Sequence, residues 1–183
     1  MKKKYGLVMC LSLGLAMACG GDDKKDIANN EKYSVEIEEP AAPMADTEQV
    51  STMEVKLGAH DYQVRIRRYP DQSLPLVVDD LDQRFYDNSV EIKILRDGSD
   101  FLKRKVTKAD FAKFLSESDY KSGILLGMNC DVARCDASRF YFTAQVGQAG
   151  EGPAFLILVP TNGGAIQVDR DNTQDEIGYK DLE

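Results

Sequence analysis

Cysteines carry most of the reactive chemistry that this sequence offers. Of the four, Cys130 and Cys135 are separated by only four residues, in a segment expected to connect two strands. Outside the reducing cytoplasm, such a pair persists as a disulfide. Closing so short a loop is worth roughly 2 kcal/mol, too little to be the reason that a domain of this size folds. We therefore predict a Cys130–Cys135 disulfide that shapes a recognition loop.

Two other uses of this cysteine pair are weaker interpretations. A redox pair usually has the C-x-x-C spacing on a helix, which Cys130 and Cys135 lack. A zinc site needs more than two thiolate ligands, and the single histidine of the chain, His60, is distant in sequence. We predict no metal site and no cofactor.

Two further patterns suggest catalysis. His60 is a candidate general base, because histidine is the residue type that changes charge near neutral pH, but no serine or cysteine nucleophile stands out as its partner. Residues Ser118–Lys121 fit the S-x-x-K pattern of serine acyl-enzymes, but no second motif accompanies them, and we interpret them as a polar link. We therefore expect no catalytic residue and favour a binding or structural role. The alternative is a small envelope hydrolase whose site is assembled from residues distant in sequence.

The N-terminal segment predicts export and lipidation. Lys2–Lys4 precede an apolar stretch, Tyr5–Ala18, that is too short to span a bilayer. The stretch ends in small residues followed by Cys19, which resembles a lipobox. We predict that residues 1–18 are a signal peptide and that Cys19 carries acyl chains that anchor the protein in the outer membrane. The alternative is ordinary secretory cleavage after Ala18, which releases a soluble protein.

The predicted mature chain is acidic. Processing removes three of the 23 basic residues and none of the 31 acidic ones, so the formal net charge changes from −8 to −11. This charge argues against nucleic acid as a partner, because phosphate binding needs a basic face. The expected partners are the membrane, through the lipid on Cys19, and an unidentified protein or glycan.

The composition changes directly after Cys19. From Gly20 to Val50 the chain carries nine acidic and three basic side chains, and Pro40 and Pro43 interrupt any regular structure. We predict a disordered acidic tether over residues 19–52. Glycines and aspartates after the acylated cysteine resemble a surface-export signal, but the order of the charges differs from the usual one. Periplasmic and surface-exposed locations both stay open.

From residue 53 to residue 183 the pattern predicts a single β-rich domain. Apolar and polar residues alternate in His60–Arg67 and again in Val90–Ile94, which is typical of half-buried strands. Asp97–Gly98 predicts a tight turn into a further strand at 101–106. More strands are expected at 123–129, 140–146, 155–159 and 165–168. Residues 155–159 are apolar on both faces, which predicts a central strand that is covered on each side.

One short helix is expected between the two groups of strands. Thr107 and Asp110 form a capping-box pattern, and Val106 can pack on Phe111 as a hydrophobic staple. Basic runs such as Arg65–Arg68 fall in alternating segments and indicate solvated strand faces. The predicted fold class is mainly β: an antiparallel β-sandwich or partly open barrel of about eight strands with one short inserted helix.

A family resemblance rests on three segments of this β-rich region. Tyr86–Ile94, Asp97–Ser99 and Val106–Phe111 resemble small lipoproteins of gut Bacteroidales that are grouped as domain-of-unknown-function family 4738. The resemblance covers the chain from about Val55 to the C-terminus. It implies a β-rich lipoprotein and brings no activity, substrate or catalytic residue.

Overall fold

The computed structural model describes residues 41–148 and 150–172. Cys19, the predicted signal peptide and residues 19–40 of the predicted tether lie outside this part. The described residues form ten strands, one 3-10 helix and one α-helix. None of the helices in this part is long and apolar enough to cross a membrane.

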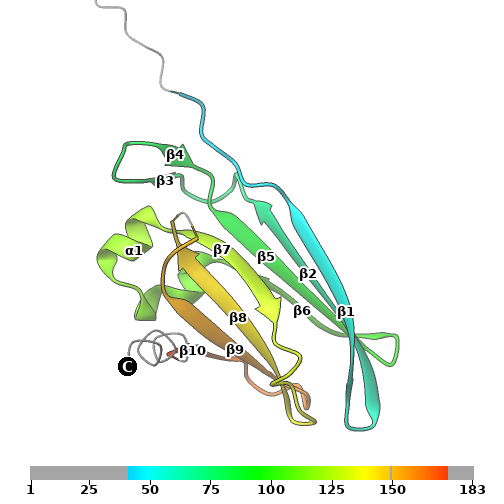
Figure 1. The fold of residues 1–183 in the computed structure, drawn as a ribbon. Coiled ribbons are helices and arrows are strands. Elements are labelled where there is room, and N and C mark those ends of the chain that lie inside the picture. Colours follow the sequence, from blue (N-terminus) through cyan, green and yellow to red (C-terminus); the bar gives the residue numbers. More distant parts are fainter. Residues whose placement is uncertain (1–40, 149, 173–183) are drawn as a thin grey trace, which may run out of the picture. The chain divides into compact units, whose positions relative to one another are not determined.

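The strands follow one another in a series of antiparallel hairpins (Figure 1). They are β1 (Gln49–Leu57), β2 (His60–Pro70), β3 (Val77–Val78), β4 (Arg84–Phe85), β5 (Asn88–Arg96), β6 (Ser99–Val106), β7 (Ile124–Cys130), β8 (Arg139–Gly147), β9 (Ala154–Pro160) and β10 (Gln167–Arg170). The helical segments are the 3-10 helix η1 (Lys108–Phe114) and the α-helix α1 (Glu117–Ser122).

The first sheet has the strand order β1-β2-β5-β6. In β2, Tyr62, Val64 and Ile66 are buried while the residues between them are exposed, which confirms the period of two. The turn between β5 and β6 places Asp97 and Gly98 at φ 50° and 79°. Both are left-handed, as a type I′ turn requires, so the predicted hairpin is confirmed.

The second sheet has the strand order β10-β9-β8-β7. As predicted, β9 is internal, with β8 and β10 on its two sides. Its inward residues Phe155, Ile157 and Val159 are buried, while Leu156 and Leu158 on the outer face are only half-buried. The outer face of this sheet is therefore partly open to solvent, so the expectation that β9 is covered on each side is wrong for that face.

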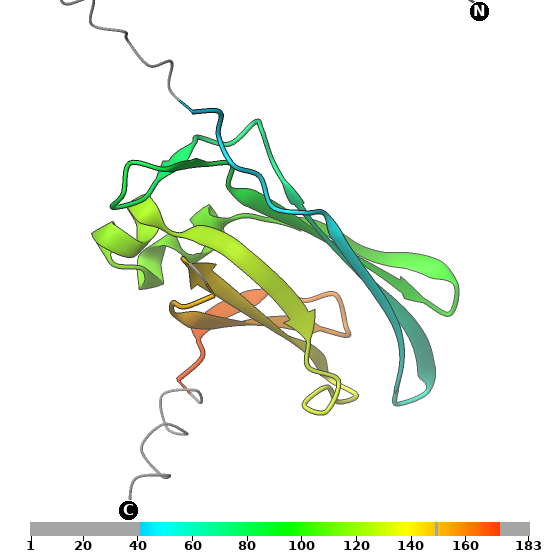
Figure 2. The same ribbon diagram turned by 45° about the horizontal axis from the view of Figure 1, so that its top comes forward.

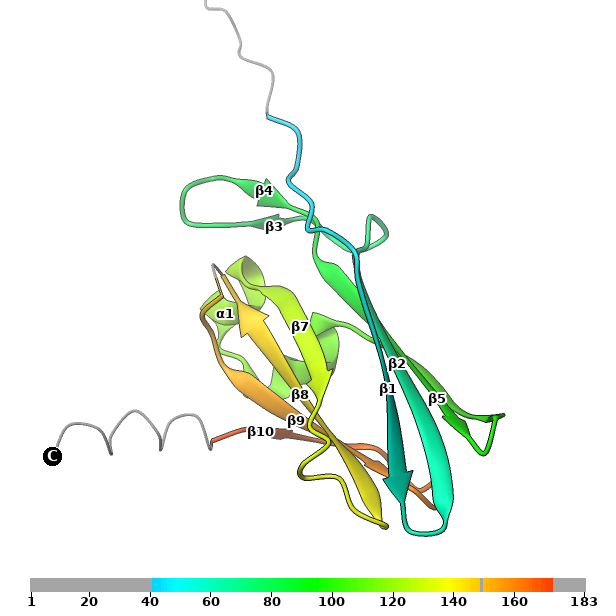
Figure 3. The ribbon, with the colours of Figure 1, turned by 45° about the vertical axis from the view of Figure 1, so that its right-hand side comes forward.

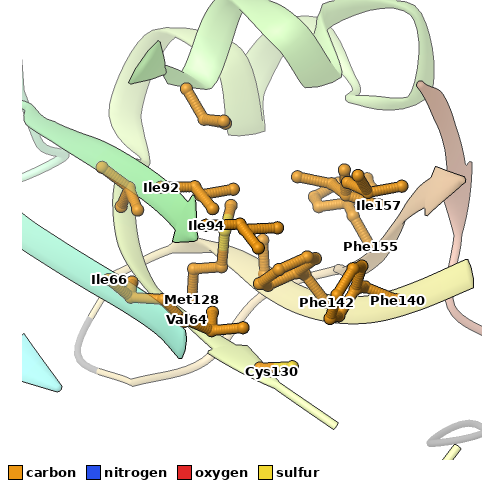
Figure 4. Packing of buried hydrophobic residues seen from close by; sticks show 14 of the residues in the cluster. Val64, Ile66, Ile92, Ile94, Met128, Cys130, Phe140, Phe142, Phe155 and Ile157 are labelled. Carbon is orange, nitrogen blue, oxygen red and sulfur yellow. The ribbon is translucent and has the colours of Figure 1, made fainter. Parts of the chain in front are cut away.

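The two sheets pack face to face and enclose the hydrophobic core (Figures 2 and 3). Val64 and Ile92 of the first sheet point toward Phe142 and Ile157 of the second (Figure 4). Phe111 of η1 extends this core, because its ring stacks on Phe155 with centroids 4.7 Å apart. The architecture is an antiparallel β-sandwich, one of the two predicted forms.

Three features differ from the sequence-based expectation. The described residues contain ten strands, because a short hairpin, β3 and β4, forms around Asp79, whose carboxylate accepts the amides of Leu81 and Gln83. The helix after Thr107 has the predicted capping box, but its geometry is 3-10. Ser118–Lys121, interpreted as a polar link, lie within the helix α1.

The first sheet also begins earlier than the expected domain boundary. β1 starts at Gln49, four residues before Met53. Upstream of it, Met44 forms an isolated bridge with Phe85 and exchanges main-chain hydrogen bonds with Arg84 and Tyr86. Residues 44–52 are therefore part of the β domain.

Candidate functional site

Two polar residues occupy core-facing positions at one end of the first sheet. Arg68 follows Ile66 on β2 with the same parity, and Asn88 precedes Val90 on β5 in the same way. Asn88 is fully buried, and the side chain of Arg68 is 13% exposed. At this end, the inner face of the first sheet therefore carries hydrogen-bonding groups in place of apolar ones.

These groups bind the free edge of β7. Arg68 donates to the carbonyl of Leu126, and Asn88 Nδ2 donates to the carbonyl of Leu125 at 2.9 Å. Asp87 accepts the Leu125 amide at 2.8 Å. Because an edge strand leaves every second main-chain group unpaired, these side chains take the place of a neighbouring strand along the first half of β7.

The second half of β7 borders a cleft of about 660 Å³. One wall consists of β1 and β2 and the other of β7, β8 and the start of β9. The cleft is lined by Gln49, Val50, Ser51, Ile66, Arg68, Leu126, Gly127, Met128, Asn129, Thr143, Ala144, Gln145 and Ala154. Both β1 and β7 are edge strands in the described part of the chain, so the cleft lies between two strand edges.

Arg68 is the charged residue of this lining. Its Nη1 lies 3.1 Å from Asp46 Oδ2, and Asp46 in turn accepts Asn88 Nδ2 at 2.7 Å. The Nε of Arg68 is buried and has no hydrogen-bond partner among the described residues. A buried donor without a partner is costly, so Arg68 is held in this position at a cost in stability.

Gly127 opens the cleft on the side of the second sheet. A Cβ added at this residue would meet no atom within 4 Å. Val50, on the opposite wall, is 50% exposed, which is unusual for a valine in a strand. The cleft thus offers unoccupied space, an apolar contact and a row of amide and hydroxyl side chains.

The predicted cysteine pair lies at the end of β7. Cys130 is the last residue of the strand and faces the core, whereas Cys135 is half-buried in the loop that follows. Their sulfur atoms are in contact at 3.8 Å, as free thiols. The structure therefore brings the two predicted residues together, and their disulfide stays a prediction.

A single turn of chain presents Cys135 to the end of the β7–β8 ladder. The amides of Arg134 and Cys135 both donate to the carbonyl of Asp131, while the Asp131 amide donates to Tyr141. Because the Asp131 carbonyl is used within the turn, the Tyr141 amide donates to Cys135 Sγ instead, at 3.4 Å.

These contacts shift the pKa values of the two thiols in opposite directions. The hydrogen bond with Cys135, together with burial, raises the pKa of the Cys130 thiol. The same hydrogen bond, and the one from the Tyr141 amide, lower the pKa of Cys135 to about 7. Burial of the thiol and, to a smaller extent, the carboxylates of Asp131 and Asp136 oppose this decrease. Cys135 is the thiol that ionises first.

His60 lies at the opposite end of the first sheet from Arg68. Its Nδ1 is hydrogen-bonded to Asp97 Oδ2 at 2.6 Å, and both side chains are about half exposed. The Asp61 amide and His60 lower the pKa of Asp97. In the described part of the chain no hydroxyl or thiol is hydrogen-bonded to the His60 ring, and no group of three or more His, Cys, Asp and Glu could hold a metal ion.

Two further buried charged side chains, Asp71 and Lys108, stabilise the fold through polar contacts. Asp71 accepts hydrogen bonds from Lys105, Ser73 and Ser89, which hold the pKa of its carboxyl well below the usual range. Lys108 Nζ lies 3.3 Å from Asp87 Oδ2 and donates to the Gly123 carbonyl at 2.6 Å. Both groups are saturated by protein partners, which is typical of structural rather than catalytic charges.

Comparison with known proteins assigns the chain to a family. The family model of a domain of unknown function, DUF4738, matches residues 28–163, which include β1 to β9. The chain belongs to the DUF4738 family. All three segments on which the resemblance was based lie within the match, so the resemblance to family 4738 is confirmed. The DUF4738 description assigns no activity, and no curated protein matches the chain.

The sequence predicted the cysteine site of this DUF4738 member and missed the cleft. Arg68 was assigned to a solvated basic run, although Tyr62, Val64 and Ile66 share its parity and mark the core face of β2. The two-residue alternation along β2 was therefore the signal that could have placed Arg68 on the core-facing side of the strand. Which strand edge it would meet depends on how the two sheets pack, and no local pattern encodes this.

Proposed function

We propose that this protein is a lipid-anchored protein of the bacterial cell envelope whose β-sandwich is a non-catalytic binding module. The anchor is the predicted acylated Cys19, which holds the protein in the outer membrane on its periplasmic or surface side. The ligand is an extended polypeptide segment that occupies the cleft between β1 and β7.

The position of the cleft between two edge strands carries this proposal. An edge strand presents a row of main-chain N–H and C=O groups that have no partner within its own sheet. A polypeptide in extended conformation satisfies such groups by adding as a further strand, and its alternate side chains then enter neighbouring pockets. Side chains already fill this role along the first half of β7, and the second half, from Gly127 onward, borders open space.

The lining suits a polypeptide in two further respects. Gln49, Asn129 and Gln145 provide amide groups that both donate and accept, as main-chain groups require. Exposed Val50 provides an apolar contact for a side chain.

A random dodecapeptide library selected against the full mature domain tests the proposal. Selected peptides should bind the wild-type protein and lose at least tenfold in affinity, about 1.4 kcal/mol, on Gly127→Leu. This change fills the cleft, and its Cβ meets no other atom. Lys103→Leu, on the exposed face of β6, is the matched control and should leave binding unchanged.

The same pair of variants distinguishes other ligands. If selected peptides bind Gly127→Leu and wild type equally, the cleft is not their site and the proposal is wrong. A glycan array in which oligosaccharides bind the wild type but not Gly127→Leu, while no peptide does, would replace the polypeptide with a glycan.

The alternative function is a small envelope hydrolase. The hydrogen bond between His60 and Asp97 favours it, because a carboxylate that orients an imidazole is a recurring part of hydrolase sites. Hydrolysis of chromogenic ester and peptide substrates that disappears in His60→Gln would establish this alternative. We favour the binding module because the described residues join no nucleophile to this pair.

A further inference from the structure

We propose that Cys130 and Cys135 form a reversible thiol–disulfide exchange site, in which Cys135 attacks small-molecule or peptide disulfides and Cys130 resolves the mixed disulfide. This activity is independent of the polypeptide-binding cleft. It goes beyond a permanent loop disulfide, because it assigns different roles to the two sulfur atoms.

Accessibility separates the two roles. Cys130 faces the core with 9% of the residue exposed. An external disulfide therefore cannot align its S–S bond with the Cys130 sulfur. Cys135 is half-buried in a surface loop. Thiol–disulfide exchange requires collinear approach of the attacking and the attacked sulfur, so the first contact with a substrate falls to Cys135.

The hydrogen bonds of Cys135 suit a nucleophilic thiolate. The Tyr141 amide, at the end of the β8 ladder, donates to its sulfur at 3.4 Å, and the Cys130 sulfur lies 3.8 Å away, where its thiol can donate to a Cys135 thiolate. In the protonated form, Cys135 Sγ itself donates to the Asp131 carbonyl at 3.2 Å. The contacts from the Tyr141 amide and the Cys130 thiol stabilise negative charge on Cys135 and lower its pKa to about 7. The thiolate is the reactive form, and a thiol with a pKa near the ambient pH is the most effective attacker.

Contact between the sulfur atoms then allows resolution. In the first step the Cys135 thiolate attacks a disulfide RSSR, a bond forms between Cys135 and one sulfur, and RS⁻ leaves and takes up a proton from solvent. In the second step Cys130 gives its proton to solvent and attacks Cys135 Sγ, and the second RS⁻ leaves and is protonated. The protein dithiol is oxidised to a disulfide, and RSSR is reduced to two RSH.

The turn from Asp131 to Arg134 sets the geometry of this exchange. Arg134 Nε pairs with Asp131 Oδ2 at 2.6 Å, and Arg134 Nη2 lies 3.5 Å from Asp171 Oδ2 on the chain after β10. These ion pairs hold the turn against the second sheet. They keep Cys135 beside Cys130 in the reduced protein, so resolution requires no large rearrangement.

Oxidised glutathione is the probe that tests the two roles, with the full mature chain reduced beforehand. The wild type should form an internal disulfide and release two glutathione thiols for each oxidised glutathione consumed. Cys130→Ala should accumulate a glutathione adduct on Cys135 at least tenfold faster than Cys135→Ala accumulates one on Cys130. Equal rates, or a faster reaction of Cys135→Ala, would overturn the assignment.

Two further measurements guard against a folding defect in the variants. In the wild type, acid-trapped intermediates digested and sequenced by mass spectrometry should carry glutathione on Cys135 and not on Cys130. The rate of iodoacetamide alkylation of Cys135 should reach half its maximum near pH 7 in the wild type and at higher pH in Cys130→Ala, which loses a hydrogen-bond donor. Trapped adducts on Cys130 in the wild type would contradict the proposal.

Discussion

The side-chain amide of Asn88 on β5 donates to the main-chain carbonyl of Leu125 on β7, 2.9 Å away, and so joins the two sheets of the sandwich. The same amide nitrogen also donates to Asp46 Oδ2 at 2.7 Å. Asn88 is fully buried, and its bond to the Leu125 carbonyl is shielded from solvent. One side chain thus protects a strand edge that another polypeptide would otherwise pair with.

Replacing this side chain should destabilise the domain. We expect Asn88→Ala to lower the free energy of unfolding by about 2 kcal/mol, because the buried carbonyl of Leu125 loses its partner. Urea denaturation followed by circular dichroism measures this change. Lys103→Ala, on the exposed face of β6, is the control and should change the value by less than about 0.5 kcal/mol. A similarly small effect of Asn88→Ala would show that the bond does not hold the sheets together.

Asp71 should make the free energy of unfolding of the domain depend on pH in the acidic range. Its pKa is lowered in the folded protein by Lys105, Ser73 and Ser89, whereas in the unfolded chain it is near 3.9. The stabilisation is therefore complete above that value and is lost as the pH falls below it. Urea denaturation from pH 7 to pH 2 should show a steeper fall for the wild type than for Asp71→Asn. Parallel curves for the two proteins would contradict this linkage.

The sequence predicted the strands of this domain more reliably than it predicted how they meet. Alternation in β2 and β5 and the Asp97–Gly98 turn are local signals, and each corresponds to an observed element. The helix α1 was missed although its signal is also local: Ser116 caps it by accepting the Asp119 amide at 3.1 Å.

Features that depend on contacts between distant parts of the chain could not be predicted from the sequence, for a physical reason. The cleft depends on the distance between β1 and β7, which lie in different sheets and have no pairing register with each other. The closeness of Cys130 and Cys135, in contrast, follows from their short separation in sequence. The closeness of the two cysteines was therefore accessible from the sequence, and the cleft was not.

Removing both cysteines should leave the fold intact. In protein prepared in an oxidising compartment, we expect Cys130→Ser with Cys135→Ser to lower the melting temperature by several degrees, which corresponds to roughly 2 kcal/mol for the lost loop closure. Thermal unfolding followed by circular dichroism measures this shift. The wild type under reducing conditions is the control and should resemble the double variant. Complete loss of the fold in the double variant would contradict this prediction and would show that the domain needs the two cysteines in order to fold.

Lipidation should depend on a single residue. Expressed in a Gram-negative host, the full chain should partition into the detergent phase, because its acyl chains bury many methylenes at about 0.8 kcal/mol each. Cys19→Ala lacks the acylation site and should stay in the aqueous phase. Cys10→Ala, inside the predicted signal peptide, is the matched control and should behave as the wild type. Equal partitioning of wild type and Cys19→Ala would refute the anchor.

Amide hydrogen exchange of the mature protein with a selected dodecapeptide tests the central claim most directly. If the peptide adds as a strand in the cleft, exchange should slow at least tenfold in the second half of β7, Gly127–Asn129, and at the start of β1, Gln49–Ser51. The β5–β6 turn at Asp97–Gly98, far from the cleft along the first sheet, should be unchanged. Protection confined to the loops, with β1 and β7 exchanging as in the free protein, would contradict strand addition.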